Sequence, residues 1–145
     1  MGYAHYWSSE NEVSDIAWKK IVEDTRKLVA AFGHSVELEV GQEVEFALST
    51  DCCETLVLTK APMKSRFCKT FHYPPDRLVC AILSVAAAAS PDIHVSSDAR
   101  MGSRPDGWPE ATRWASKVLG YKVVPPWKYR HRSMWQRLLE MAHLR

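Results

Sequence analysis

A short run between residues 67 and 76 holds most of the side chains in this sequence that could do chemistry together. Lys69, Thr70, His72 and Asp76 lie there, next to the predicted start of a helix. A helix N-terminus presents free backbone N–H groups and a partial positive charge, so it favours anions. Lys69 would add a full charge and Thr70 a hydroxyl donor. The run therefore predicts a site for a phosphate or a nucleotide-like anion.

Residues outside this run could complete the site. Arg66 offers a second cation, and Tyr3 offers an aromatic ring that could stack on a base. Glu54 and Asp98 lie at the ends of predicted strands and could orient the polar groups of a ligand. With these residues the prediction is a binding site for a small anionic ligand.

The carboxylates of Glu54, Asp76 and Asp98 also allow two other interpretations. If they converged, they could act as acid and base in a hydrolysis or hold Mg²⁺. In a structural interpretation, Lys69 forms an ion pair with Glu54 or Asp98, and Asp76 improves the start of the helix. The sequence leaves open whether the protein is an enzyme, and a carboxylate-dependent hydrolase is kept as an alternative.

The cysteines give weaker signals. Cys68 and His72, together with Cys52 or Cys53, could supply three zinc ligands, but the spacing is not that of a paired-Cys zinc motif and a fourth ligand is missing. Cys68 could instead be a nucleophile with His72 or His5 as its base. We expect free thiols, no metal site and no cofactor.

Residues 121–145 form a predicted tail that is rich in cations and aromatic rings. Six cations stand there against one acidic residue, Glu140. This composition suits nucleic acid, an acidic protein surface or a dimer arm, and a protein contact is slightly favoured. An acidic hairpin of a second copy is one such target, which would make a homo-oligomer. The residues expected to bind a partner are Trp127, Lys128, Arg130, Arg132 and Trp135.

The net charge of +2 conceals a division between the two halves of the chain. Residues 1–58 carry 11 acidic and 4 basic side chains, whereas residues 59–145 carry 6 acidic and 15 basic side chains. Such a division can orient a protein on a charged partner, or it can bring the two halves together within one fold.

Length and hydropathy indicate a single domain that does not enter a membrane. A chain of 145 residues with 46% hydrophobic and 25% charged residues is typical of a globular protein with its own core. Its longest apolar run, from Leu78 to Ala89, is shorter than the roughly 20 residues that a membrane-spanning helix needs. The N-terminus lacks the pattern of a signal peptide, so we expect a cytoplasmic protein.

The elements that must position these side chains follow from hydrophobic periodicity and from Gly and Pro signals. Ser14 and Gly33 bracket the most strongly predicted helix, and a hairpin with a turn at Gly41-Gln42 has one apolar and one acidic face. The predicted strands are 1–7, 36–40, 44–48, 54–59 and 93–96. The predicted helices are 14–32, 75–89, 109–119 and one within 127–145, and the predicted loops are 60–73 and 100–107.

This order predicts an α+β fold, in which an antiparallel meander packs against two or three helices. We expect one domain over residues 1–120 and a helical extension over residues 121–145.

Four short segments also resemble a known family. They are Met1-Gly2-Tyr3 with Tyr6-Trp7, then Glu54, then Phe67-Cys68-Lys69-Thr70 with Asp76, and finally Ile93 and Val95 with Ser96-Ser97-Asp98. They are similar to segments of a family of small uncharacterised proteins from bacteria, bacteriophages and some eukaryotic genomes and viruses. The resemblance covers residues 1–98 and implies no established activity, although a phage source would imply a counter-defence role.

The sequence therefore predicts a small cytoplasmic protein that binds an anionic, nucleotide-like ligand at the corner between Lys69 and Asp76. One alternative is a phage-type inhibitor that contacts a host protein or a protein–nucleic acid complex. The other alternative is the carboxylate-dependent hydrolase.

Overall fold

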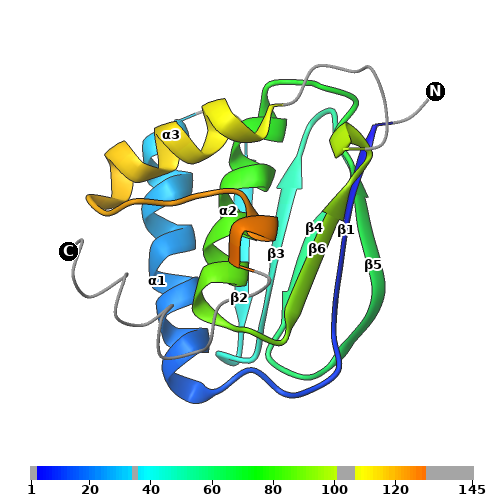
Figure 1. The fold of residues 1–145 in the computed structure, drawn as a ribbon, viewed down its shortest axis with the longest axis vertical. Coiled ribbons are helices and arrows are strands. Elements are labelled where there is room, and N and C mark those ends of the chain that lie inside the picture. Colours follow the sequence, from blue (N-terminus) through cyan, green and yellow to red (C-terminus); the bar gives the residue numbers. More distant parts are fainter. Residues whose placement is uncertain (1–2, 34–35, 101–106, 130–145) are drawn as a thin grey trace.

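The protein has an α+β fold, seen in a computed structural model that describes residues 3–33, 36–100 and 107–129. Its strands are β1 (Ala4–Ser9), β2 (Val36–Gly41), β3 (Glu45–Thr50), β4 (Leu56–Thr59), β5 (Met63–Lys69) and β6 (Ile93–Ser97). Its helices are α1 (Asp15–Phe32), α2 (Pro75–Ala89) and α3 (Trp108–Leu119), with short 3₁₀ turns η1 (Asp98–Arg100) and η2 (Pro126–Tyr129). The three helices form one layer and the strands form the other (Figure 1).

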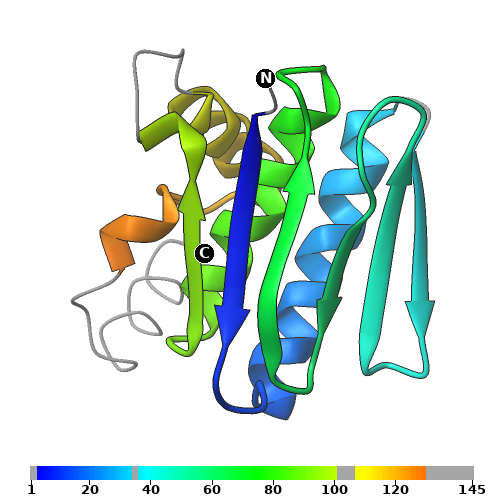
Figure 2. The same ribbon diagram turned by 90° about the vertical axis from the view of Figure 1, so that its right-hand side faces the viewer.

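The strands form two antiparallel sheets, with strand orders β5-β1-β6 and β2-β3-β4. Figure 2 shows the sheets edge to edge, with β4 beside β5 and all three helices behind the strands. Within residues 3–33, 36–100 and 107–129, no helix covers the opposite face of the strands. Strand β1 is the central strand of its sheet. Because successive side chains of a strand point to opposite faces, those of β1 reach both the core and this open face.

The helices form where capping and periodicity predict them. Ser14 accepts a hydrogen bond from the Ala17 backbone at the start of α1, and Gly33 ends α1 with a left-handed φ of 68°. Helix α2 is buried along nearly all of its length, because its Ala and aliphatic residues lie between the sheet, α1 and α3. The predicted burial of this helix is confirmed.

The predicted hairpin is also present, with its glutamates facing outward. Glu37 and Glu39 of β2 are exposed, while Phe46 and Leu48 of β3 are buried beneath α1. The turn differs from the prediction: Gln42 and Glu43 both have positive φ, so Val44 lies in the turn and is exposed.

The predicted basic loop 60–73 is wrong over half of its length, because residues 63–69 form β5. Only Met63 and Cys68 of this strand are buried, so the sequence lacks the alternation that marks a strand. Pairing with β1 shifts register between Trp7 and Ser9, and Ser65 has a φ of 40°. This irregularity turns most side chains of β5 outward.

Part of the predicted tail belongs to the domain core. Tyr121 is buried, and its hydroxyl donates to Asp24 Oδ2 at 2.5 Å, while Lys20 donates to the same oxygen at 2.7 Å. Val123 is buried as well, so the packing continues beyond the predicted domain boundary at residue 120. Within the described ranges, none of the helices has the length and apolar character needed to cross a lipid bilayer.

Candidate functional site

Several chain segments that are distant in sequence meet at one end of the β5-β1-β6 sheet. His5 of β1 lies at their centre and is fully buried. Its Nε2 lies 2.5 Å from Asp76 Oδ1 in the first turn of α2, and its Nδ1 lies 2.8 Å from Ser97 Oγ at the end of β6. Thr70, which follows β5, donates its hydroxyl hydrogen to Asp76 Oδ1 at 2.6 Å. We call His5, Thr70, Asp76 and Ser97 the His5 network.

One placement of the protons satisfies every member of the His5 network. With a proton on Nε2, His5 donates to Asp76, and Nδ1 accepts from the Ser97 hydroxyl. Ser97 Oγ then accepts from the backbone N–H of Ala99 at 3.1 Å. Buried polar groups are costly unless they are paired, so this arrangement makes the network part of the stable core.

Aromatic rings enclose the His5 network. Tyr3 and Trp108 both contact the His5 ring edge to face, with centroid distances of 5.0 and 4.9 Å. His72 stacks on Tyr3 at 3.6 Å, and this contact fixes the loop between β5 and α2. A Cβ added at Gly107 would lie 3.1 Å from Asp76 Oδ2, so the backbone before α3 closes tightly over the carboxylate.

The network keeps the Asp76 carboxylate ionised. Burial alone would raise its pKa, but the hydrogen bond from His5, the electrostatic interaction with that ring and the hydrogen bond from Thr70 together outweigh burial. The pKa of Asp76 therefore lies below its ordinary value of 3.8.

This lowered pKa makes the stability of the fold sensitive to acid. Ionised Asp76 stabilises the folded state above the pKa of the unfolded chain, and that contribution is lost as pH falls through the lower, folded value. In urea unfolding, the free-energy difference between the wild type and Asp76→Asn should be constant near neutral pH and should shrink below about pH 4. A difference that does not change with pH would contradict this assignment.

The side chains that could ligate a metal ion are hydrogen-bonded to each other in this structure. Within the described residues, the single group whose possible ligand atoms lie close together is His5, Asp76 and Cys80, with those atoms within 4.8 Å of one another. Tetrahedral zinc ligands at about 2.0–2.1 Å from the ion stand roughly 3.3 Å apart. The 2.5 Å between His5 Nε2 and Asp76 Oδ1 is a hydrogen-bond distance, and a metal would have to break that bond.

The other cysteines do not support nucleophilic catalysis. Burial raises the pKa of Cys68 to about 12 and that of Cys53 to about 11. Cys68 is therefore a thiol at neutral pH, and it donates to the Glu54 carbonyl at 3.1 Å. The group of close ligand atoms around His5 contains none of the residues that the sequence suggested for zinc, which are Cys52, Cys53, Cys68 and His72.

The structure divides the predicted ligand residues into buried and exposed sets. Tyr3, Thr70 and Asp76 are buried, and the last two bind each other instead of facing solvent. Lys69 and Arg66 are exposed on β5. The predicted corner is thus closed on its inner side, and Thr70 cannot hold a ligand anion while it donates to Asp76.

The Asp98 carboxylate and the Glu54 backbone have hydrogen-bond partners within the fold. Asp98 is half-buried, and it accepts from the Ala4 backbone at 3.0 Å and from the Tyr6 hydroxyl at 3.1 Å. The backbone N–H of Glu54 donates to the Lys69 carbonyl at 3.1 Å. No ion pair joins Lys69 to Glu54 or Asp98 in the part of the chain that the structure describes.

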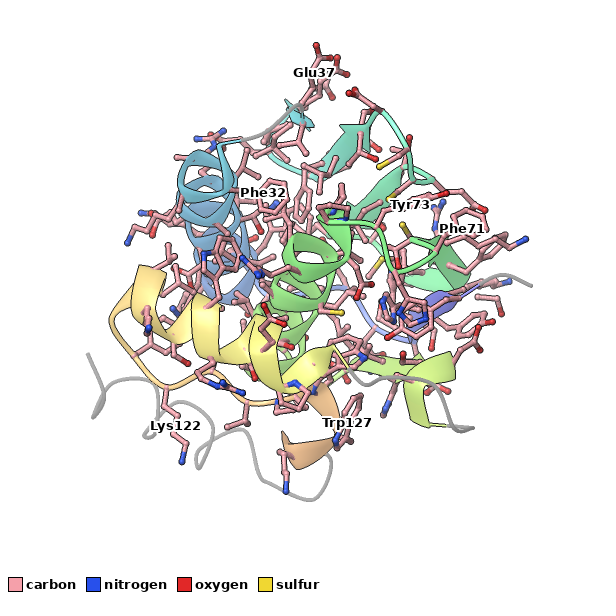
Figure 3. All side chains as sticks on the ribbon, turned by 90° about the horizontal axis from the view of Figure 1, so that it is seen from above. Phe32, Glu37, Phe71, Tyr73, Lys122 and Trp127 are labelled. Carbon is pink, nitrogen blue, oxygen red and sulfur yellow. The ribbon has the colours of Figure 1, made fainter. Side chains whose placement is uncertain are left out.

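The partner residues predicted in the tail lie partly outside the described residues. Trp127 is half-buried and contacts Trp108 with ring centroids 5.2 Å apart, and Figure 3 shows it against the body of the protein. Lys128 is exposed. Arg130, Arg132 and Trp135 are not among the residues that the structure describes.

A hollow of about 530 Å³ lies on the open face of the β5-β1-β6 sheet. Small side chains create it, because Ser8, Ser65 and Ser96 occupy outward positions on three neighbouring strands. Larger side chains surround these serines: Tyr6 and Phe67, which are directly paired across β1 and β5, together with Arg66 and His94.

Sequence reasoning missed both His5 as the centre of the buried network and the hollow on the open face. His5 could have been found from the alternate residues Tyr3, His5 and Trp7, since it is the polar member of a buried apolar series. The hollow had no sequence signal, because it requires β5 to be a strand and to lie beside β1.

Comparisons with known proteins do not assign this site. A scan against protein-family models, a search of curated proteins and a search of solved structures each found no match. The function of the protein must therefore be argued from its own residues.

Proposed function

We propose that this protein binds an anionic, nucleotide-like ligand in the hollow on the open face of the β5-β1-β6 sheet. The observation that carries the proposal is the pairing of two exposed aromatic rings, Tyr6 and Phe67, beside the exposed cation of Arg66. A base can stack on the rings, while Arg66 and the serine hydroxyls can hold phosphate oxygens. A volume of about 530 Å³ falls within the range of small-ligand sites.

The ligand site therefore lies next to the corner predicted from the sequence. Thr70 and Asp76 belong to the buried His5 network, where Asp76 accepts hydrogen bonds from Thr70 and His5. Arg66 and Lys69 are exposed cations of β5. We therefore still propose an anionic ligand, held by these cations and not by Thr70 and Asp76. We propose a cytoplasmic binding protein and no reaction, because Asp76 and Asp98 both have partners within the fold.

Contact with a host protein is the second candidate. The exposed glutamates of the β2–β3 hairpin favour it, and Figure 3 shows Glu37 projecting away from the body of the protein. Packing of Trp127 on Trp108 weighs against it, because this removes one of the rings predicted to meet a partner. A counter-defence role is compatible with either candidate.

Calorimetric titration with ATP, and with the other nucleoside mono- and triphosphates in turn, tests the proposal. We expect one ligand of this class to bind the wild type, and we expect Arg66→Gln and Phe67→Ala each to weaken binding at least about tenfold, since each removes a charge-assisted or stacking contact. Lys27→Gln is the matched control, because Lys27 is an exposed cation on α1, in the helical layer. Equal binding by all four proteins, or no binding by the wild type, would overturn the proposal.

A further inference from the structure

The ribbon formed by β5 and the loop after it carries a second pair of exposed aromatic rings. Phe71 and Tyr73 have ring centroids 6.0 Å apart, and Figure 3 shows them side by side, pointing away from the helices. Together with Tyr6 and Phe67, these four aromatic residues are 40–52% exposed. They make up four of the six large hydrophobic residues that are exposed in the described part of the chain.

The two aromatic pairs are held close together. Phe67 and Phe71 are four residues apart, so their Cα atoms are separated by at most roughly 14 Å. The loop is fixed between them, because Phe71 and His72 adopt left-handed φ values of 53° and 63° and His72 stacks on the buried Tyr3. The pairs are therefore two platforms at a set separation, and we call them the sheet platform (Tyr6, Phe67) and the loop platform (Phe71, Tyr73).

The open surface along β5 is longer than one nucleotide needs. A second hollow of about 510 Å³ adjoins the first, and the two share Ser65, Arg66 and Phe67. Pro62 and Lys64 line its far end. The two hollows thus extend along β5 from Pro62 to Phe67, and the loop platform begins four residues after Phe67.

Cations follow the same path. Lys64, Arg66 and Lys69 are exposed on β5, and none of them forms an ion pair with another described residue. A row of cations beside aromatic platforms is the pattern that binds single strands, because the cations contact successive phosphates while the bases stack on the rings. A duplex cannot use such platforms, since its base faces are already stacked.

We infer that the ligand is a single-stranded nucleic acid of several nucleotides, which lies along β5. One base stacks on the sheet platform and a later base on the loop platform, while Lys64, Arg66 and Lys69 neutralise the phosphates between and beside them. This inference rests on the proposed function, and it names the class of ligand for the same hollow.

Fluorescence anisotropy with labelled oligo-dT and oligo-U of increasing length tests the inference. Affinity should rise with length until one strand spans both platforms, and a duplex of equal length should bind at least about tenfold more weakly. Three phosphate contacts predict a slope of about −2 in log affinity against log salt, and Lys64→Gln should reduce it by about 0.7.

The variant Phe71→Ala separates this inference from the proposed function. It should weaken oligonucleotide binding about 5- to 150-fold, the effect of losing one stacked base, and leave mononucleotide binding unchanged. Ile16→Ala is the control, because Ile16 is an exposed hydrophobic residue on α1. Mononucleotide binding with no gain from length, and no effect of Phe71→Ala, would overturn the inference and leave the proposed function standing.

Three other outcomes are decisive. Absence of binding to mononucleotide and oligonucleotide would overturn both proposals. Equal or tighter binding of the duplex would overturn the single-strand inference. Full displacement of the oligonucleotide by an equal concentration of poly-glutamate would show that charge alone is recognised, and it would favour an acidic protein partner.

Discussion

Replacing Asp76 by alanine is expected to lower the free energy of unfolding by about 3–5 kcal/mol, because it breaks a buried, charged hydrogen-bond network. The alanine would leave the His5 Nε2 and the Thr70 hydroxyl without their acceptor inside the core. Buried donors that lose an acceptor bear the full cost of being removed from water. Urea unfolding at neutral pH measures the effect directly.

Two further variants show whether the loss comes from the network. Asp76→Asn keeps an acceptor oxygen in the same place, so it should lose less stability than alanine does. Glu110→Ala removes an exposed carboxylate that pairs with the exposed Arg77, and it should change stability by less than about 1 kcal/mol. If Asp76→Ala cost no more than Glu110→Ala, the network would not be a stabilising part of the core.

Trp108→Ala is expected to have an effect of similar size, about 3–5 kcal/mol, because it removes a large ring that is fully buried. Trp108 lies between His5 on the sheet side and Trp127 of the segment that follows α3. Its loss would leave a cavity and would also uncover Trp127, so residues 121–129 should become easier to cleave. Urea unfolding and limited proteolysis check the two effects separately.

Trp114→Ala is the matched control for this prediction. Trp114 is on the same helix, but it is half-buried and contacts Phe32 at a centroid distance of 6.1 Å. It should lose less stability, and it should leave cleavage within residues 121–129 unchanged. Equal losses from the two tryptophans would contradict the central position given to Trp108.

The sequence was most informative where one element carries its own signals. Helix α1 could be predicted to within a residue, because Ser14, Gly33 and an apolar stripe all agree. The β2–β3 hairpin and helix α2 were predicted for the same reason. Strand β5 was missed, because just two of its side chains are buried and its pairing is irregular.

The candidate site could be predicted in part. The residues near Lys69 and Asp76 do lie at a place where distant segments meet, but the sequence could not tell which of their side chains point inward. That direction depends on the pairing of β1 with β5 and β6, which joins residues more than 50 positions apart. No local pattern encodes such a pairing, so His5 and the hollow became visible when the strands were placed side by side.

The His5 network has a consequence for how β1 finds its place between two strands that are distant in sequence. Successive side chains of a strand point to opposite faces, so a slip of one residue would bring Tyr6 into the core and expel His5. In that slipped sheet, Asp76 would lose its hydrogen bond from His5 and keep the one from Thr70, so its buried charge would be only partly compensated. The network therefore disfavours a misaligned sheet, because misalignment costs the buried carboxylate its hydrogen bond to His5.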